Sequence, residues 1–264
     1  MKQYVIDAFA DKPFTGNQAA ICVVDAWPRD AFMRAMALEN NFSETAFLLP
    51  KGSGYGLRWF TPEGEIDLCG HATLAAAFTV REIVEPGREG VTFDTASGPL
   101  TVAHRGSAYE MDFPAFALKR VPVTPAMAEA LGATPIEAWM GRDLVCVMED
   151  ESAVRSLAPD VERVAKLDGL LCHVTAAGSG VYDCVSRSFA PKMGVAEDPV
   201  CGSGHCHIFP YWSGRLGKER LLGWQASPRG GALTGAVHNG RVTLGGSATL
   251  FCTADVAVEP DAAE

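Results

Sequence analysis

The stretch RWFTPEGEIDLCGH at residues 58–71 leads directly into an Ala-rich apolar run, and its pattern occurs twice in the chain. The second copy is RSFAPKMGVAEDPVCGS at residues 187–203, where an arginine, a phenylalanine, a proline, an aspartate and a Cys-Gly pair recur in the same order. The two arginines are 129 residues apart, close to half of the 264 residues. Self-similarity at such a distance indicates repeated structural units. We therefore predict two similar halves, each with strand, loop, Cys-Gly pair and helix.

The segments around the two copies predict alternating strands and helices. Strands are expected over residues 4–8, 20–24, 43–49, 57–60, 98–113, 138–148, 169–175 and 182–189. Helices are expected from Pro28 and over residues 71–80, 125–132, 154–166 and 205–216. The apolar helix after Gly70 should be buried on nearly all sides, and Pro210 should kink the last helix or lie in its first turns.

A connector with three prolines, residues 114–125, predicts the boundary between the halves. The first domain, 1–117, would carry Glu44 and the loop Cys69-Gly70-His71. The second domain, 118–264, would carry Asp198 and the loop Cys201-Gly202-Ser203, and its last strand could cross back to the first domain.

Composition narrows the class of protein. Hydrophobic residues make up 48% of the chain and charged residues 20%, which predicts a folded core and excludes a disordered chain. The net charge of −10, without a basic run, argues against nucleic-acid binding. No apolar run approaches the ~20 residues of a membrane span, and the N-terminus lacks the apolar core of a signal peptide. The eight cysteines form no C-x-x-C pair, so we expect a reduced, cytoplasmic protein whose thiols are mostly buried and inert.

The two Cys-Gly pairs lie where predicted helices begin. N–H groups in a first turn have no partner within the helix and can bind a carboxylate or an enolate, and a thiol there has a lowered pKa. Two such loops facing one cleft would stabilise a carbanion next to a carboxylate. For either loop alone, a tight turn that needs glycine is the competing explanation.

Other residues offer weaker signals. Glu44 lies in an otherwise uncharged run, where burial would suit a general base, but strand alternation alone places it on the solvent face. Metal-ligand residue types cluster at Cys201, His205, Cys206 and His207, but one short stretch is poorly suited to enclose a metal, so none is expected. Nucleotide-binding glycine motifs are absent, so no nucleotide cofactor is expected.

Ordered motifs along the whole chain resemble those of the PhzF-like isomerases, a family within the diaminopimelate-epimerase-like superfamily. The matching segments are DAF at 7–9, FTGNQAA at 14–20, NFSETAF at 41–47, WFTP at 59–62, DLCGHATLA at 67–75, SRSFAP at 186–191, EDPVCGSGH at 197–205 and QASPRGG at 225–231. The resemblance implies an α+β fold of two pseudo-symmetric domains, each a curled, mostly antiparallel, barrel-like sheet around a central helix, with the active site between them.

The resemblance also implies site residues. Glu44 would be the acid–base residue, His71 and Asp198 would orient the substrate, and Ser203 would join the second loop in stabilising negative charge. The substrate-binding set would further include Asn17, Gly70, Gly202 and Gly204. The reaction would move a proton on a small carboxylate-bearing molecule, with no metal or organic cofactor. Relatives often form dimers, so the resemblance is compatible with a homodimer, and the sequence does not decide the oligomeric state.

One departure from the family pattern leaves an alternative. Many members carry threonine where this chain has Cys201, so Cys69 and Cys201 resemble the thiol pair of the diaminopimelate epimerases and proline racemases. Against a two-thiol racemase, histidine follows Cys69-Gly70 where those epimerases carry asparagine. A non-catalytic protein that binds small carboxylates is a third hypothesis. The substrate is not identified; Arg187 and Arg229 are candidates for binding its anionic group, and structural pairing is the competing role.

Overall fold

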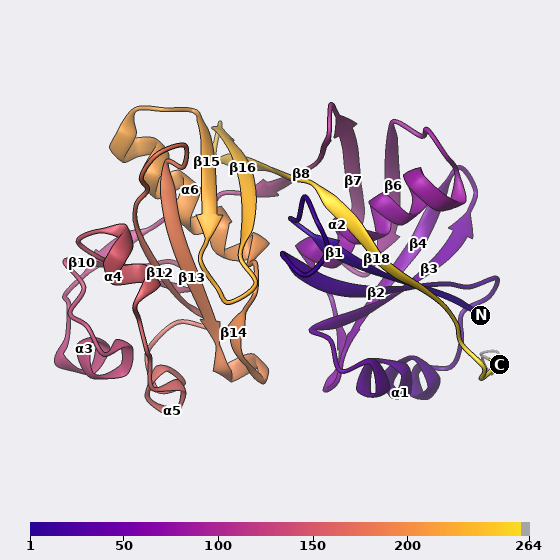
Figure 1. The fold of residues 1–264 in the computed structure, drawn as a ribbon, viewed down its shortest axis with the longest axis horizontal. Coiled ribbons are helices and arrows are strands. Elements are labelled where there is room, and N and C mark those ends of the chain that lie inside the picture. Colours follow the sequence, from indigo (N-terminus) through magenta and orange to yellow (C-terminus); the bar gives the residue numbers. More distant parts are fainter. Residues whose placement is uncertain (260–264) are drawn as a thin grey trace. The chain divides into compact units, whose positions relative to one another are not determined.

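The computed structural model describes residues 1–259, which divide into two compact units (Figure 1). The first unit is Met1–Met111 together with the described residues from Gly245 onward, and the second is Asp112–Leu244. The division thus lies at 111/112, where the sequence placed it at 117/118. No helix among the described residues is long and apolar enough to span a membrane.

The first unit is a sheet curled around one helix. Its elements are β1 (Lys2–Ala8), β2 (Asn17–Val23), α1 (Asp30–Asn40), β3 (Glu44–Lys51), β4 (Gly54–Thr61), β5 (Gly64–Ile66), α2 (Gly70–Thr79) with a π-helical turn (Val80–Val84), β6 (Gly90–Thr95), β7 (Gly98–Arg105), β8 (Ala108–Pro114) and β18 (Ala248–Asp255). Helix α2 packs against β1, β2, β3, β7 and β18 (Figure 1). Its alanines and Leu74 are buried, which confirms the prediction of a helix without a solvent face.

The second unit repeats this plan around α6. Its elements are β9 (Lys119–Val121), α3 (Pro125–Leu131), β10 (Glu137–Met140), β11 (Leu144–Val147), α4 (Glu151–Arg155), α5 (Val161–Val164), β12 (Cys172–Ala177), β13 (Cys184–Ala190), a 3-10 turn (Pro191–Met193), β14 (Val195–Asp198), α6 (Gly202–Leu216), β15 (Arg220–Gln225), β16 (Gly231–His238) and β17 (Arg241–Gly246). Helix α6 packs against β12, β15 and β16.

Strand pairing confirms the repeat. In the first unit β1–β2 is antiparallel, β2–β3 parallel, β3–β4 antiparallel, β4–β6 parallel and β6–β7 antiparallel. The pairs β10–β11, β11–β12, β12–β13, β13–β15 and β15–β16 follow the same sequence of orientations. Each repeat of the Cys-Gly motif precedes the central helix of its own unit.

The prediction of one helix over residues 154–166 is wrong, because two short helices, α4 and α5, occupy this region. The Asp150 carboxylate caps α4 and the Asp160 carboxylate caps α5, each accepting a backbone N–H in the first turn. Pro159 lies between the two helices and lacks the N–H that a continuous helix requires.

Pro210 lies inside α6, and the carbonyl group that it leaves without a helical hydrogen bond has another partner. Because proline has no N–H, the carbonyl of Cys206 one turn earlier cannot accept its usual helical hydrogen bond. The N–H of Phe116 donates to this carbonyl instead, at 3.0 Å. The connector around Phe116 is thereby fastened to the central helix of its unit.

Candidate active site

In the first unit, the predicted site residues meet where three elements begin. Asn17 is the first residue of β2 and Glu44 the first of β3, and these parallel strands place both residues at one end of the sheet. Helix α2 starts at the same place, with Cys69 as its N-cap and His71 in its first turn. His71 Nε2 lies 2.9 Å from Glu44 Oε2, and its Nδ1 lies 3.2 Å from the Asn17 amide nitrogen.

The Glu44–His71 pair is largely buried, with side chains 13% and 7% exposed. Glu44 is therefore not on an open solvent face, as alternation alone suggested. The two facing atoms make an ion pair by distance, although neither completes a hydrogen bond. Burial disfavours the imidazolium, but Cys69 and Glu44 outweigh it and raise the pKa of His71 well above its usual value. The Glu44 carboxyl group and the His71 imidazole thus share a largely buried position.

The two predicted thiols behave differently from the expectation for helix N-termini. Burial and the charge of Glu44 raise the pKa of Cys69, although His71 acts in the opposite direction. Burial and Asp198 raise the pKa of Cys201 well above its usual value. The predicted lowering of the thiol pKa is therefore wrong at both positions, because desolvation of a thiolate outweighs the helix dipole.

Cys201 has a structural role in the second unit. Its Sγ accepts the N–H of Gly204 at 3.3 Å and so caps α6. Gly204 itself has no room for a side chain, because an added Cβ would lie 2.7 Å from Cε1 of His173. Close packing and capping therefore explain the cysteine and the second glycine of this loop without a ligand.

The loop that carries Asp198 and Cys201 is fixed by Gln225, a fully buried residue at the end of β15. The Gln225 amide donates to the Asp198 carbonyl at 2.6 Å and accepts the Cys201 N–H at 2.9 Å. Ser188 Oγ donates to the same amide oxygen at 3.5 Å and lies 3.0 Å from Nδ1 of His173. A buried polar network thus fixes the start of α6.

The network ends at Asp143, whose side chain is fully buried beside the turn before β11. His173 Nε2 lies 3.1 Å from its carboxylate, and Arg142 donates to both of its oxygens at 3.0 and 2.7 Å. Burial opposes ionisation, but His173 and Arg142 outweigh it and hold the pKa of Asp143 well below its usual range. Arg142 also donates to Ser203 Oγ at 3.1 Å.

Sequence reasoning missed Arg142, Asp143, His173 and Gln225. The available signal was polar residues that interrupt apolar strands, such as His173 within LLCHV at 170–174. Arg187, which the sequence suggested for anion binding, is instead occupied within the protein: it donates to both oxygens of Glu197 at 2.7 Å and to the Leu157 carbonyl at 2.6 Å.

Two groups among the described residues could hold a metal ion. One is Glu44, Cys69 and His71, and the other is Asp143, His173 and His207; within each group the donor atoms lie within 4.8 Å of one another. Of the stretch singled out from the sequence, His207 belongs to the second group, while Cys201, His205 and Cys206 belong to neither group. Nδ1 of His205 lies 2.7 Å from the Cys201 carbonyl instead.

We expect removal of metal to leave the protein unchanged, because the donors of both groups already contact one another within the protein. Dialysis against EDTA should alter neither the melting temperature nor the catalysed exchange proposed below, and elemental analysis should find no stoichiometric metal. A loss on dialysis that Zn²⁺ restores would show that one of the two groups is a metal site.

We expect two buried histidines, His205 and His207, to make the stability of the fold depend on pH in the acidic range. Burial lowers the pKa of His205 and of His207 to about 4 each. Between the unfolded value near 6.5 and about 4, the unfolded chain binds more protons, so stability falls as the pH falls through this window. We expect the free energy of unfolding to drop by up to ~1.4 kcal/mol per pH unit for each histidine.

Urea unfolding at several pH values across this range measures the free energy of unfolding. His205→Gln should reduce the slope of this free energy against pH. Equal slopes in both proteins would contradict this assignment.

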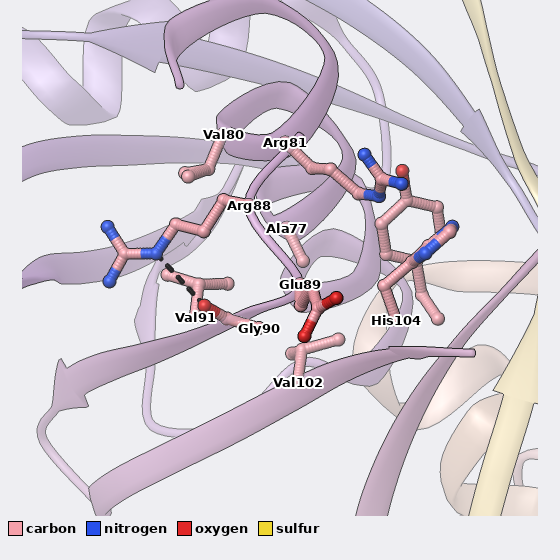
Figure 2. Close-up of a pocket in the computed structure, with 10 residues that line it drawn as sticks. Ala77, Val80, Arg81, Arg88, Glu89, Gly90, Val91, Val102 and His104 are labelled. Carbon is pink, nitrogen blue, oxygen red and sulfur yellow. Dashed lines mark hydrogen bonds between the residues drawn. The ribbon is translucent and has the colours of Figure 1, made fainter. Parts of the chain in front are cut away.

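A small cavity in the first unit lies apart from these groups (Figure 2). Arg81, Arg88 and His104 line it beside the π-helical turn, and Arg88 Nε donates to the Gly90 carbonyl at 2.9 Å. Its volume of about 10 Å³ is near the room that one water requires. The cavity is therefore too small for an organic substrate.

The two units repeat one plan of strands around a central helix, the α+β architecture that the resemblance implied. A family model described as "phenazine biosynthesis-like protein" matches residues 6–254, and the chain belongs to this PhzF family. An uncharacterized isomerase of Pseudomonas aeruginosa is 44% identical over 250 residues, covering 94% of this chain and 95% of that protein. The crystal structure of a PhzF-family protein from Enterococcus faecalis has a TM-score of 0.95 at 46% identity, covering 97% of this chain and 99% of that one.

More distant structures share the fold alone. A probable proline racemase from Agrobacterium radiobacter matches with a TM-score of 0.64 at 11% identity, over 98% of this chain and 93% of that chain. The fold expected from the sequence is thereby confirmed. The relatives with 43–44% identity, which are named as isomerases, show that the chain is an enzyme of an isomerase family.

Proposed function

We propose that this protein is a cofactor-independent isomerase that moves a proton on a small carboxylate-bearing substrate, with Glu44 as the acid–base residue. The observation that carries the proposal is the largely buried Glu44 carboxyl group at the start of β3, with its Oε2 2.9 Å from Nε2 of His71 in the first turn of α2. Asn17 fixes the other side of the imidazole through its 3.2 Å contact with Nδ1.

In the proposed reaction the Glu44 carboxylate takes a proton from a substrate carbon. The C–H electron pair moves into the adjacent π system, where hydrogen-bond donors stabilise the developing negative charge. The same carboxyl group returns the proton to another carbon, so atoms and charge balance without a cofactor. His71 orients Glu44 and the substrate. Asp198 and Ser203 remain predicted substrate-binding residues, as the sequence resemblance implies.

Two features favour Glu44 over a pair of thiols. Both Cys69 and Cys201 are buried, and burial raises the pKa of each thiol, which disfavours the thiolate that proton abstraction requires. Cys201 is also engaged in capping α6. The Glu44 carboxyl group, by contrast, can act as a base in its ionised form, and its Oε2 lies 2.9 Å from Nε2 of His71.

The proposal is tested by proton NMR of small carboxylates in D₂O. A panel of amino acids, 2-hydroxy acids and unsaturated ring carboxylates is incubated with the wild-type protein, Cys69→Ser and Cys201→Ser. We expect the wild type to exchange a carbon-bound proton in at least one class, and both serine variants to keep exchange within about tenfold of it, since neither thiol is the base.

Two outcomes contradict this proposal. Loss of exchange in both serine variants, with the fold intact by circular dichroism, would show a two-thiol racemase. Binding of panel carboxylates by the wild type with no exchange in any of them would show a non-catalytic binding protein.

A further inference from the structure

The indole N–H of Trp59 is a buried hydrogen-bond donor without an acceptor in the described part of the chain. Its side chain, on β4, is 1% exposed. A buried tryptophan N–H normally has a partner. Trp139 Nε1, for comparison, donates to Glu137 at 3.0 Å. Trp212 Nε1 donates to Thr175 Oγ1 at 2.9 Å. The unpaired donor of Trp59 therefore departs from a rule that these two tryptophans follow.

Strand register places Trp59 on the same face of the sheet as Glu44. Phe47 of β3 and Phe60 of β4 pack with α1 on one face. Side chains alternate between the faces of a strand, so Glu44, Ala46 and Trp59 lie on the opposite face, where Glu44 meets α2. Ala46 is directly opposite Trp59. Glu44 is thus the diagonal neighbour of Trp59, at a separation of about 7–8 Å that an aromatic side chain can span.

A second strand pairing brings Trp59 to the start of α2. Trp59 is opposite Ile66 of β5, and Cys69, the N-cap of α2, follows Ile66 by three residues. His71 in the first turn of this helix lies 2.9 Å from Glu44. The two pairings and the short connection from β5 to α2 therefore place a buried, unpaired N–H beside the Glu44–His71 pair.

We propose that Trp59 is a substrate-binding residue whose indole N–H donates to an oxygen conjugated with the carbon that loses its proton. This inference rests on the proposed function. When Glu44 takes the proton, the C–H electron pair moves toward that oxygen, and an N–H that points at it binds the developing negative charge more tightly than the neutral substrate. The electron pair returns to carbon when Glu44 gives the proton back. Indole nitrogen is a donor only, so it keeps this role at any working pH.

The inference narrows the class of substrate. Its transferable proton lies on a carbon conjugated with a carboxyl or carbonyl oxygen, because a donor that cannot accept requires an oxygen at that place. An amine or an isolated alkene at the reacting carbon would leave the N–H of Trp59 unpaired in the complex, at the cost of a buried donor without a partner.

The proposal is tested by NMR of the full chain carrying ¹⁵N-indole tryptophan, with the signals assigned through bonds in the wild type. The ligands are benzoate, whose carboxyl-bearing carbon is planar as in the charged intermediate, cyclohexanecarboxylate, in which this carbon is tetrahedral, and each carboxylate of the exchange panel. We expect benzoate to move the indole proton of Trp59 downfield, as a new hydrogen bond does, and cyclohexanecarboxylate to move it less. The indole signal of Trp212, which already has a partner, should stay in place.

Trp59→Phe removes the N–H and keeps an aromatic side chain. We expect it to lower kcat for deuterium exchange by about 10²–10³-fold, the effect of removing one donor to a developing oxyanion. KM should stay within about threefold of the wild-type value, since the bond strengthens mainly in the transition state. Trp212→Phe, the same substitution at a buried tryptophan whose N–H is bonded within the protein, is the matched control and should exchange as the wild type does.

Two results would overturn the assignment. One is a Trp59 indole signal that stays in place with benzoate and with every panel carboxylate, and the other is exchange by folded Trp59→Phe within about threefold of the wild type. If this variant does not fold, the wild-type signal decides. A shift at Trp59 without exchange by the wild type would refute the isomerase proposal and leave the contact. Exchange that depends on Glu44, with no shift at Trp59, would refute the contact alone.

Discussion

Glu44→Gln is expected to lower solvent-deuterium exchange into the substrate by about 10²–10⁴-fold, the range that a positioned acid–base residue contributes. Glutamine keeps the shape and the hydrogen-bonding capacity of the side chain but cannot accept and return a proton. The neighbouring groups that could replace Glu44 as a base are His71 and Cys69. The pKa of His71 is raised, which disfavours its neutral form, and burial raises the pKa of the Cys69 thiol, which disfavours its thiolate. Exchange rates from proton NMR in D₂O, normalised to folded protein, give the measurement.

The matched control is Glu65→Gln. Glu65 is also a glutamate of the first unit that contacts a basic side chain, Arg58, but it is exposed, whereas Glu44 is largely buried beside His71. We expect this control to exchange at the wild-type rate. If Glu44→Gln exchanged deuterium at the wild-type rate, Glu44 would not be the acid–base residue.

Asp143→Ala is expected to cost the second unit ~3–5 kcal/mol of stability, the usual effect of removing one partner of a buried ion pair. The carboxylate is fully buried, and its loss leaves His173 and the inner edge of Arg142 without an acceptor. The free energy of unfolding from urea denaturation measures the effect. Asp143→Asn, which keeps an oxygen acceptor, should cost less.

Asp112→Ala is the control for this effect. Asp112 pairs with Arg241, but both side chains are about half exposed, so its removal should cost within ~1 kcal/mol. If Asp143→Ala and Asp112→Ala destabilise the protein equally, the buried network does not fix this part of the fold.

The repeat could be predicted from the sequence because its residues are close along the chain. Each copy places an arginine on a strand, a turn and a Cys-Gly pair before a helix, and the structure shows these as β4 with α2 and β13 with α6. The central helix after Gly70 could also be predicted, since an Ala-rich run without a polar face leaves few alternatives. Local patterns of this kind need no knowledge of distant contacts.

The polar network of the second unit could not be predicted in the same way. Asp143 precedes β11, His173 lies on β12 and Gln225 ends β15, and only the sheet brings them together. The prediction that the two thiols have lowered pKa values failed for a related reason. The helix dipole can be inferred from sequence, but the burial that outweighs it at Cys69 and Cys201 depends on the whole fold.

The measurement that separates a carboxylate base from a thiol pair most directly is the pH dependence of alkylation at each cysteine, resolved by peptide mass spectrometry. It requires no substrate and reports both the pKa and the access of each thiol. Cys69 and Cys201 should react slowly at neutral pH, no faster than the other buried cysteines, and their rates should still be rising with pH where an ordinary thiol is already ionised. Rapid reaction of both at neutral pH, with the other six cysteines slow, would contradict the assignment of the base to Glu44.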